Sequence, residues 1–544
     1  PASARRSGFV TARYVRAVRV GSEDLGNATV SISAFNLMRE TDEVKHGRLV
    51  GFEFNVEQTY LLVFTEFNIL VFADDVHISD IPSPYDAERI AQISWAQSAD
   101  TLLITHPDVP PKLVTRNAVL VGETLQERWR IEDWRFVEEE TREGGDNSDK
   151  SKPLLGNALQ MPFYKFADAD VTLDPSGTSL DATITLVASA PVFQAEHVGQ
   201  HFRLDRRQVR ITAVDSPTNA TALVREKLQS GAATKDWEEP ALSVLRGWPT
   251  SVGFHQDRLV LGGSRDLPNR LWLSKSSDLF NFDLGEGLDD NAIEFAILSD
   301  QVNAIRHVFS GRHLQVMTSG AEWMVTGDPL TPENVQLKRQ TRVGSLIDRT
   351  VPPRDVDGGT LFVSRSGDAL REFLFTDVEQ AYQANDLALL AKHMVVDPID
   401  QDYDQTERLF HVVLADGTIS TVTVYRAEQV TAWSKQMTAG TVVSIAVVDG
   451  RTYLLVVRES GQFIERFDNS VCLDSAVTGI VEAPTDTWSG LGHLEGLTVS
   501  VVGDGAVLSD NIVTAGQVTL ETPVSSVEIG LPVTMEIEPL PIVA

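Results

Sequence analysis

Six segments of the 544-residue chain share one outline, in which a short apolar run and a turn are followed by a second strand-like run. The apolar runs begin at residues 102, 259, 314, 361, 411 and 454, so the last five starts lie 55, 47, 50 and 43 residues apart. A period of this length, made of strands linked by turns, is typical of the blades of a β-propeller. The first gap spans 157 residues, which corresponds to about one blade plus an insertion of about a hundred residues. The repeats therefore predict an all-β fold with a β-propeller core of roughly six blades.

The remaining strands divide the chain around this core. Alternating strands at 49–54, 59–64 and 68–72 predict a small antiparallel unit before the propeller. Strands at 182–187 and 209–214 indicate that the insertion is itself a β domain. We expect five parts: an N-terminal antiparallel β unit at 1–80, a first blade at 81–120, an inserted β domain at 121–245 with a flexible polar loop near 138–153, the remaining blades at 246–470, and a C-terminal small β domain at 471–544 that can pack on the N-terminal unit.

Three short helices are expected between the strands. A helix around residues 86–93 is predicted by its leading prolines and spaced isoleucines. One turn of helix is predicted within residues 192–202. The clearest helical pattern covers residues 381–397, whose apolar residues fall on one face of a helix: Leu387, Leu390 and Met394.

The charge balance is acidic and bounds the partners. Lys and Arg total 46 and Asp and Glu total 77, which gives a net charge of −31. Such a surplus repels polyanions and argues against a surface that grips DNA by neutralising phosphates. No apolar run approaches the 18 residues of a membrane-spanning helix, so no membrane span is expected. The single cysteine, Cys472, excludes an intrachain disulfide and a zinc site built from cysteines, and we expect it to be a small buried residue.

Candidate catalytic and metal-binding residues are few. His197 and His201, with Glu196 beside them, have the i,i+4 spacing of helical metal ligands, but two ligands without a third favour solvated polar residues. The carboxylate runs at 138–140 and 289–290 lack the separated, differently buried pairs that acid–base catalysis needs, so we interpret them as solvated faces. No nucleotide-binding, zinc-protease or serine-hydrolase motif occurs. We therefore predict no enzyme, no cofactor, and no catalytic, cofactor-binding or metal-binding residues.

A glycan-related function stays open as an alternative, because propellers often carry glycosidase sites. The sialidase Asp-box is absent, although Ser274–Phe282 approaches it, and no Trp-Asp dipeptide of the WD40 type occurs. The nine tryptophans lie mostly beside or inside strands, where packing between blades explains them better than stacking on sugars. The alternative hypothesis is therefore a secreted β-propeller glycosidase or glycan-binding lectin.

Longer phrases of the chain resemble a known family. Ile93–Leu113 (ISWAQSADTLLITHPDVPPKL) and Gly247–Gly263 (GWPTSVGFHQDRLVLGG) are similar to signature phrases of the tail tubular protein B family of short-tailed bacteriophages (podoviruses), whose members are also called nozzle or tail hub proteins. Further similar phrases lie in Trp272–Phe282, Val422–Ser434 and Leu494–Gly505. The likeness runs from the opening strands to near the end of the chain, and several of its phrases are long and ordered.

The resemblance implies a structural protein of the virion tail. Members of that family form a ring of six below the adaptor ring and portal, enclose the channel through which the genome leaves, and offer docking surfaces for tail fibres or spikes. The resemblance therefore implies a homo-hexamer that contacts a tail adaptor ring (tail tubular protein A-like) and the portal complex. It also implies that genomic DNA passes through the channel without specific binding, and that the inserted 121–245 domain faces outward as a fibre dock.

Two further expectations accompany the resemblance. The family's N-terminal lead-in is expected to be missing, because Arg5–Gly8 is similar to a motif that lies further into those chains, and a start at Pro1 without a signal pattern indicates a mature, trimmed or incomplete product. Six copies of −31 each would form an anionic ring along which DNA slides without sticking. A bacterial scaffold propeller acquired from a prophage is a third alternative.

Overall fold

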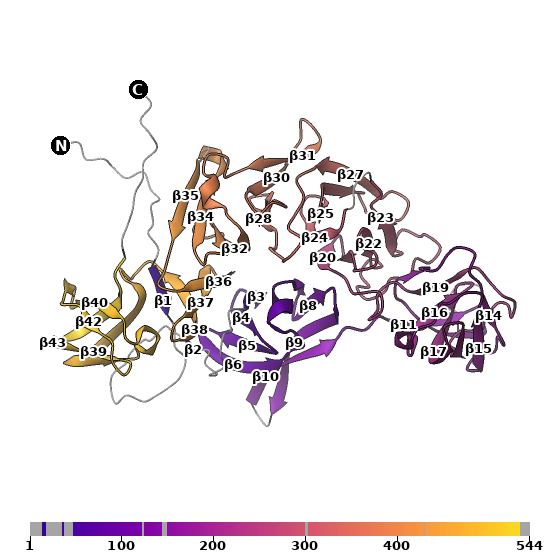
Figure 1. Ribbon diagram of the computed structural model, residues 1–544, viewed down its shortest axis with the longest axis horizontal. Helices are drawn as coiled ribbons and strands as arrows, with labels where there is room; N and C mark the ends of the chain where they lie inside the picture. Colours follow the sequence, from indigo (N-terminus) through magenta and orange to yellow (C-terminus); the bar gives the residue numbers. More distant parts are fainter. Residues whose placement is uncertain are drawn as a thin grey trace.

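The computed structural model describes residues 14–17, 35–36, 47–121, 124–143, 150–299, 303–428 and 430–533. Most regular structure in these residues is β-strand. Seven blades surround a common axis, and two further β domains lie on opposite sides of the ring, one near β16 and one near β43 (Figure 1). The prediction of an all-β chain with a β-propeller core, an inserted β domain and a C-terminal β appendage is confirmed.

Each blade is an antiparallel meander whose strands follow chain order from the axis outward. The first strands of the seven blades are β3 (Arg48–Asn55), β7 (Ser94–Ser98), β20 (Ser251–His255), β24 (Ile305–Ser310), β28 (Arg354–Val356), β32 (Pro398–Asp404) and β36 (Thr441–Val448). The second strands are β4 (Gln58–Thr65), β8 (Thr101–His106), β21 (Arg258–Gly262), β25 (Leu314–Thr318), β29 (Gly359–Val363), β33 (Leu409–Leu414) and β37 (Arg451–Arg458).

The third strands are β5 (Asn68–Ala73), β9 (Val109–Val121), β22 (Arg270–Leu273), β26 (Glu322–Thr326), β30 (Leu370–Thr376), β34 (Ile419–Tyr425) and β38 (Gly461–Asp468). The fourth strands of blades 1 to 6 are β6 (Val76–Pro82), β10 (Thr124–Asp133), β23 (Ile293–Ala296), β27 (Gln336–Thr341), β31 (Ala381–Asp386) and β35 (Val430–Gln436). In blade 7 the N-terminal strands β1 (Tyr14–Ala17) and β2 (Phe35–Asn36) both pair antiparallel with β38 and supply this position.

The second strand of each blade explains the sequence repeats. All residues of β21, β25, β29 and β33 are buried, because a neighbouring blade covers each face of the sheet. A strand buried on both faces reads as a continuous apolar run in the sequence. The six repeats fall on the second strands of blades 2 to 7.

Apolar clusters between neighbouring blades close the ring. Between blades 1 and 2, the rings of Phe52 and Tyr60 pack edge-on against Trp129, with centroids 5.1 and 5.0 Å from it. Between blades 7 and 1, Leu455 and Ile464 are buried against Leu49 in a shared cluster. Every other pair of neighbouring blades shares such a cluster. Because full burial of one such side chain stabilises a fold by about 1.5–3 kcal/mol, these clusters make the ring a single rigid unit.

Two predicted boundaries differ from the structure. Residues 48–82 form blade 1 instead of a separate antiparallel unit, so the ring has seven blades and not the six expected. Blade 2 runs to Asp133, because β10 pairs with β9 along ten residues from Thr124 onward, so the start of the predicted insertion belongs to the propeller. Long hairpins keep their backbone groups hydrogen-bonded, which favours extension of the blade over an early exit.

The helix predicted at 381–397 is wrong. Its first part is β31, which pairs with β30 as the outer strand of blade 5, and only the 3-10 turn η2 (Lys392–Met394) follows. The apolar residues do not share a buried face, since Leu390 is 92% exposed whereas Met394 is buried. Pairing with β30 provides hydrogen-bond partners for the backbone of residues 381–386. This tertiary pairing takes precedence over the local helical pattern. The two other predicted helical turns are present as α1 (Ala87–Ile90) and η1 (Ala195–His197).

The inserted domain is a small barrel preceded by a hairpin. The hairpin is formed by β11 (Glu138–Arg142) and β12 (Leu154–Leu159). The flexible loop predicted near 138–153 is therefore wrong for its first residues, which pair as β11, while 144–149 lie outside the described residues. The barrel strands are β13 (Phe163–Tyr164), β14 (Leu173–Pro175), β15 (Thr183–Ala188), β16 (His201–Leu204), β17 (Arg207–Ser216), β18 (Asn219–Val224) and β19 (Trp237–Pro240). Reciprocal backbone hydrogen bonds between Leu173 and Thr234 close the sheet on itself.

The C-terminal domain is built on two long antiparallel strands. They are β39 (Asp474–Ser489) and β43 (Gln517–Leu531), joined by β40 (Thr498–Gly503), β41 (Ala506–Val507), β42 (Asn511–Ile512) and the turn η4 (Gly492–Leu494). β39 also pairs with β1, which links this domain to blade 7.

Cys472 is exposed and not buried as expected, because it lies in the link before β39 instead of inside a strand.

Meander topology gives the ring two unlike faces. Turns between the first and second strands, and between the third and fourth strands, lie on one side, which we call the turn face. Gln256 and Gly327, from turns of both kinds, are hydrogen-bonded there. The connections between blades and the turns between second and third strands lie on the opposite side, called the loop face. Asp397 accepts a hydrogen bond from Ala415 N and donates one to Gly367 O on this side.

Candidate functional site

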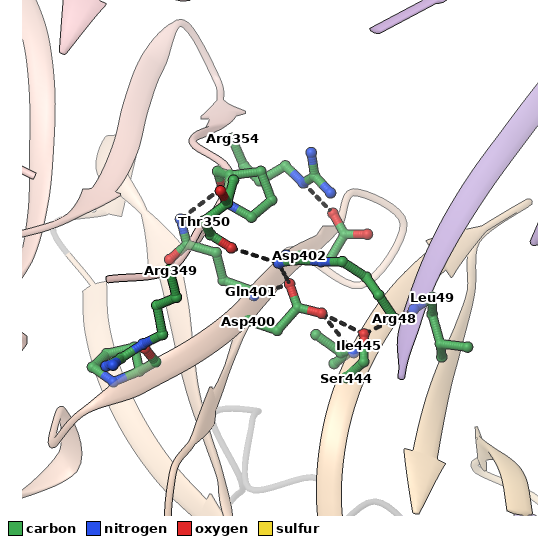
Figure 2. A network of polar contacts seen from close by, with 12 residues as sticks. Arg48, Leu49, Arg349, Thr350, Arg354, Asp400, Gln401, Asp402, Ser444 and Ile445 are labelled. Atoms are coloured by element: carbon green, nitrogen blue, oxygen red, sulfur yellow. Dashed lines mark hydrogen bonds and ion pairs between the residues drawn. The ribbon is translucent and has the colours of Figure 1, made fainter. Parts of the chain in front are cut away.

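Arg48, on the first strand of blade 1, is the centre of a buried polar network at the axis (Figure 2). Its Nη2 atom donates to Asp400 Oδ1 at 3.0 Å and to the backbone oxygen of Thr350 at 2.7 Å. The guanidinium also lies 5.2 Å from the ring centroid of Trp95. A buried charge requires both an opposite charge and hydrogen bonds, and Arg48 has them from three other blades or loops.

Asp400 ties two further first strands to this network (Figure 2). Its Oδ2 atom accepts hydrogen bonds from the hydroxyl of Ser444 and from Ile445 N, the latter at 3.2 Å. Ser444 Oγ in turn accepts from Leu49 N at 2.9 Å. Asp400 therefore joins β3, β32 and β36. Its carboxylate is hydrogen-bonded by protein groups alone.

Asp402, two residues after Asp400 on β32, makes a similar set of contacts. It accepts from Arg354 Nε at 2.7 Å and from Val447 N at 2.8 Å. This pair is more exposed than the Arg48 pair, with side-chain exposures of 28% and 13% against 4% and 4%. Charge pairs that water reaches contribute less to stability.

The segment at Thr350 crosses the axis. Thr350 N donates to the backbone oxygen of Ala91, in the connection between blades 1 and 2, at 2.9 Å, while Thr350 O accepts from Arg48. Thr350 itself belongs to the connection between blades 4 and 5, on the far side of the ring. Opposite sides of the ring are thus within hydrogen-bond distance, so a nucleic acid cannot pass along the axis of a single propeller.

Arg306 and His307, on β24, lie at this end of the axis. Burial, followed by the nearby charges of Arg306 and Arg48, lowers the pKa of His307 to about 3, so this histidine is neutral at physiological pH. Arg306 sits at a β-bulge, where the pairing of β24 with β25 shifts register. Burial lowers the pKa of Arg306, and its Nε atom is buried without a hydrogen-bond partner.

A second buried ionic cluster joins blade 7 to the C-terminal domain. Arg458 donates to both carboxylate oxygens of Glu465 at 2.7 and 2.8 Å, and also to Ser475 Oγ and Thr438 Oγ1. Thr438 Oγ1 donates to Asp474 Oδ2 at 2.8 Å. Burial and the charge of Glu465 raise the pKa of Asp474 to about 6 against the opposing effect of Arg458. Two carboxyls thus share one arginine, which makes this junction sensitive to pH.

The turn face carries a large share of the acidic surplus. Its described turns span 56–57, 74–75, 99–100, 256–257, 274–292, 311–313, 327–335, 357–358, 377–380, 405–408, 426–428 and 449–450. These turns hold 18 acidic against 4 basic side chains, a difference of −14 within the chain's −31. Most of the acidic ones are exposed and none is buried. This face therefore repels polyanions more strongly than the rest of the ring.

The structure separates the candidate metal ligands. His197 is buried, its Nδ1 accepts from Gln194 N at 3.1 Å, and its Nε2 lies 3.0 Å from Glu239 Oε2. His201 Nδ1 lies 3.1 Å from Gln208 Oε1. Both histidines therefore serve the barrel fold, and among the described residues no group of three or more His, Cys, Asp or Glu side chains is arranged to hold a metal ion.

The predicted carboxylate runs are partly paired instead of freely solvated. Glu138 accepts from Arg225 at 2.5 Å, Glu139 accepts from Asn281 at 2.9 Å, and Glu140 accepts from Arg142 at 2.8 Å, so this run fastens the hairpin β11–β12. Asp289 and Asp290 are exposed and lie on the turn face. No sequence pattern points directly to the Arg48 and Arg458 clusters, although the alternating carboxylates of Asp400, Asp402 and Asp404 indicate that one face of β32 is polar.

Comparisons with known proteins support no assignment beyond the fold. No family model and no curated protein sequence matches the chain. Among solved structures, it is similar to the Pan2 WD40 domain of Neurospora crassa (9% identity, TM-score 0.30, covering 70% of this chain and 90% of that one). It is also similar to the Cps50 (Swd1) β-propeller domain of Myceliophteria thermophila (10%, 0.31, 72% and 99%) and to AztD of Citrobacter koseri (8%, 0.30, 90% and 99%).

Likenesses at these scores add nothing to the strand topology of the chain itself. The ring of meander blades defines the class as a β-propeller, here with seven blades, an inserted barrel and a C-terminal β domain. Within the described ranges, no helix is long and apolar enough to cross a membrane.

Proposed function

We propose that this chain is a non-enzymatic structural protein of a short-tailed phage tail. In this proposal six copies form a nozzle below the adaptor and portal, conduct the genome during ejection, and anchor tail fibres or spikes. Its place is the tail of the virion. The observation that carries the proposal is the likeness of the phrases at Ile93–Leu113 and Gly247–Gly263 to the tail tubular protein B family.

The two phrases are neighbours in space, which supports their being one structural signature. Trp248 N donates to the backbone oxygen of Pro107 at 2.9 Å, so the second phrase begins against the first. Arg258 is buried and donates to the backbone oxygens of Ser274 and Asn291, both at 2.6 Å. A Cβ atom at Gly262 would lie 2.7 Å from Ile305 Cγ2 and would not fit. In the second phrase, Arg258 thus holds blade 3 together, and Gly262 allows blade 4 to pack closely against it.

The blocked axis decides where DNA passes in this proposal. Because Arg48 and Thr350 close the centre of each propeller, the channel must lie between subunits of a ring and not inside one of them. The acidic turn face is the surface best suited to line that channel, since a basic wall would retain DNA through counterion release. The inserted barrel, on the outer side of the ring of blades in Figure 1, is the proposed dock for fibres.

Two experiments test the proposal. Electron micrographs of the purified protein or of tails should reveal sixfold rings. Particles assembled without the protein should package DNA but leak it or fail to infect, and normal infectious particles would overturn the proposal. Incubation with oligosaccharides discriminates the glycosidase or lectin alternative, because clear turnover or binding would favour it.

A further inference from the structure

The loop face carries exposed apolar side chains along an arc of four successive connections between blades. They follow blades 3, 4, 5 and 6 in turn, and their exposures range from 50% to 92%. We call this set the apolar arc: Leu298, Ile347, Leu389, Leu390, Val396 and Met437. Contiguous exposed apolar surface on a soluble protein commonly marks an interaction site.

Hydrogen bonds tie two of these connections to each other and to neighbouring turns of the blades. Arg349, in the connection after blade 4, donates from Nε to the backbone oxygen of Pro398 at 2.8 Å and is also paired with Asp397. Ala415 N donates to Asp397 O at 3.0 Å, and Val442 N donates to Gly417 O at 3.0 Å. The connections that carry the arc are therefore held to the blades and to one another instead of being independent loops.

The arc is also the part of the ring where charge is balanced. The described residues of its connections (297–299, 303–304, 342–353, 387–397 and 437–440) include three basic and two acidic side chains, a net charge of +1. The turn face holds a difference of −14. Two copies that each carry −31 repel one another least where the local charge is balanced.

Arg306 adds a cation beside the arc. It lies at the start of β24, directly after the connection that holds Leu298, and the carboxylate of Asp348 in the next connection acts on it electrostatically. It makes no ion pair with any described residue, and its Nε atom is buried without a partner. A largely desolvated arginine is stabilised when a carboxylate reaches it.

We propose that the apolar arc docks a second copy of this chain, which buries Leu389 and Leu390 and brings a carboxylate to Arg306. This inference rests on the proposed function and names the surface by which neighbouring subunits meet. The contact is heterologous: one copy presents the arc and the other presents a different surface that carries the carboxylate, as a closed ring requires.

Sedimentation velocity of the purified full chain, over a concentration series up to about 100 µM, tests the proposal. At this range a contact of micromolar strength is populated. The wild type is expected to associate, and the double variant Leu389→Asp/Leu390→Asp is expected to associate at least tenfold more weakly. Val378→Asp is the matched control, because Val378 is 97% exposed on the turn face and should leave association unchanged. Arg306→Gln should weaken association at low salt and much less at high salt.

The outcomes separate this inference from the proposed function. A wild type that stays monomeric throughout the series, or a double variant that associates like the wild type, overturns the docking surface. Sixfold rings that survive the double substitution would leave the tail function standing while excluding the arc. A closed dimer that the double variant dissociates would confirm the arc as an interface but contradict a heterologous contact and a six-membered ring.

Discussion

The axis of the propeller and the junction with the C-terminal domain both bury an arginine against carboxylates, but they balance charge differently. At the axis Arg48 pairs with Asp400, and the more exposed Arg354 pairs with Asp402, so each of these two arginines has its own anion. At the junction Arg458 alone faces Glu465 and the nearby Asp474. Charge balance, and not burial alone, therefore makes the junction sensitive to pH.

The two sites also differ in how well their carboxylates are supported once the arginine is removed. Asp400 has three further donors, the hydroxyl of Ser444 and the backbone of Gln401 and Ile445. Glu465 is completely buried, and besides the Arg458 guanidinium it accepts a hydrogen bond from Ser475 Oγ. The axis is thus a redundant network, whereas the junction depends on one residue.

Arg458→Met should have the largest effect. It leaves Glu465 buried without its cation, and breaking a buried ion pair in this way costs about 3–5 kcal/mol. Urea denaturation followed by tryptophan fluorescence should show the loss. The paired variant Arg458→Met/Glu465→Leu should recover much of it, because the buried Glu465 charge is removed together with its cation and only the Asp474 carboxyl, relieved of the repulsion from Glu465, remains. A single substitution that costs less than about 1 kcal/mol would contradict the dependence of the junction on Arg458.

Arg48→Met should cost less, about 2–4 kcal/mol, since Asp400 keeps its other donors. The same denaturation experiment measures it. If Arg48→Met proves more damaging than Arg458→Met, the redundancy ascribed to the axis is wrong.

Asp474→Asn should stabilise the protein at pH 7.5. The folded pKa of about 6 lies above the ordinary value of 3.8, so the folded state holds the proton more tightly than the unfolded state does. Ionisation of Asp474 therefore costs stability in full above about pH 6, by up to about 3 kcal/mol, and this cost disappears as the pH falls from 6 toward 4. The variant's advantage should be measurable by thermal unfolding at pH 7.5 and should vanish near pH 4.

The matched control for this pH effect is Asp400→Asn, which should destabilise the protein at pH 7.5 because the Arg48 guanidinium loses its anion. Stabilisation by both asparagine substitutions would mean that the two sites do not differ in charge balance.

Arg354→Gln should have the smallest effect, about 0.5–1 kcal/mol, because water reaches the Arg354–Asp402 pair and screens it. The measurement is again the free energy of unfolding, at low and at high salt. A loss as large as that of Arg48→Met would show that position near the axis, and not burial, sets the strength of these pairs.

Most of the fold could be predicted from the sequence, because second strands buried on both faces leave apolar runs at a regular period. Blade 1 was missed although Thr59 begins such a run 43 residues before Leu102, within the same period. Its position beside other N-terminal strands favoured a separate unit. The helical spacing of Leu387, Leu390 and Met394 was misleading, since sheet pairing at β31 takes precedence over local pattern.

The polar clusters could not be predicted, for a topological reason. Arg48 and Asp400 are 352 residues apart, and Arg48 and Thr350 are 302 residues apart, so only closure of the ring brings them together. Arg458, Glu465 and Asp474 are close in sequence, but their burial follows from the docking of the C-terminal domain, which no local pattern reveals. Likewise, nothing in the sequence indicates that Glu239 is the partner of His197.

The inserted barrel leaves and rejoins the ring at almost the same point. Trp134, at its departure, donates to the backbone oxygen of Pro111 near the start of β9, and Trp248, at its return, donates to that of Pro107 in the turn just before β9. A domain whose two ends join the ring at one place can change in size or shape without shifting any blade. The seven blades can therefore stay constant while the inserted barrel is altered or replaced.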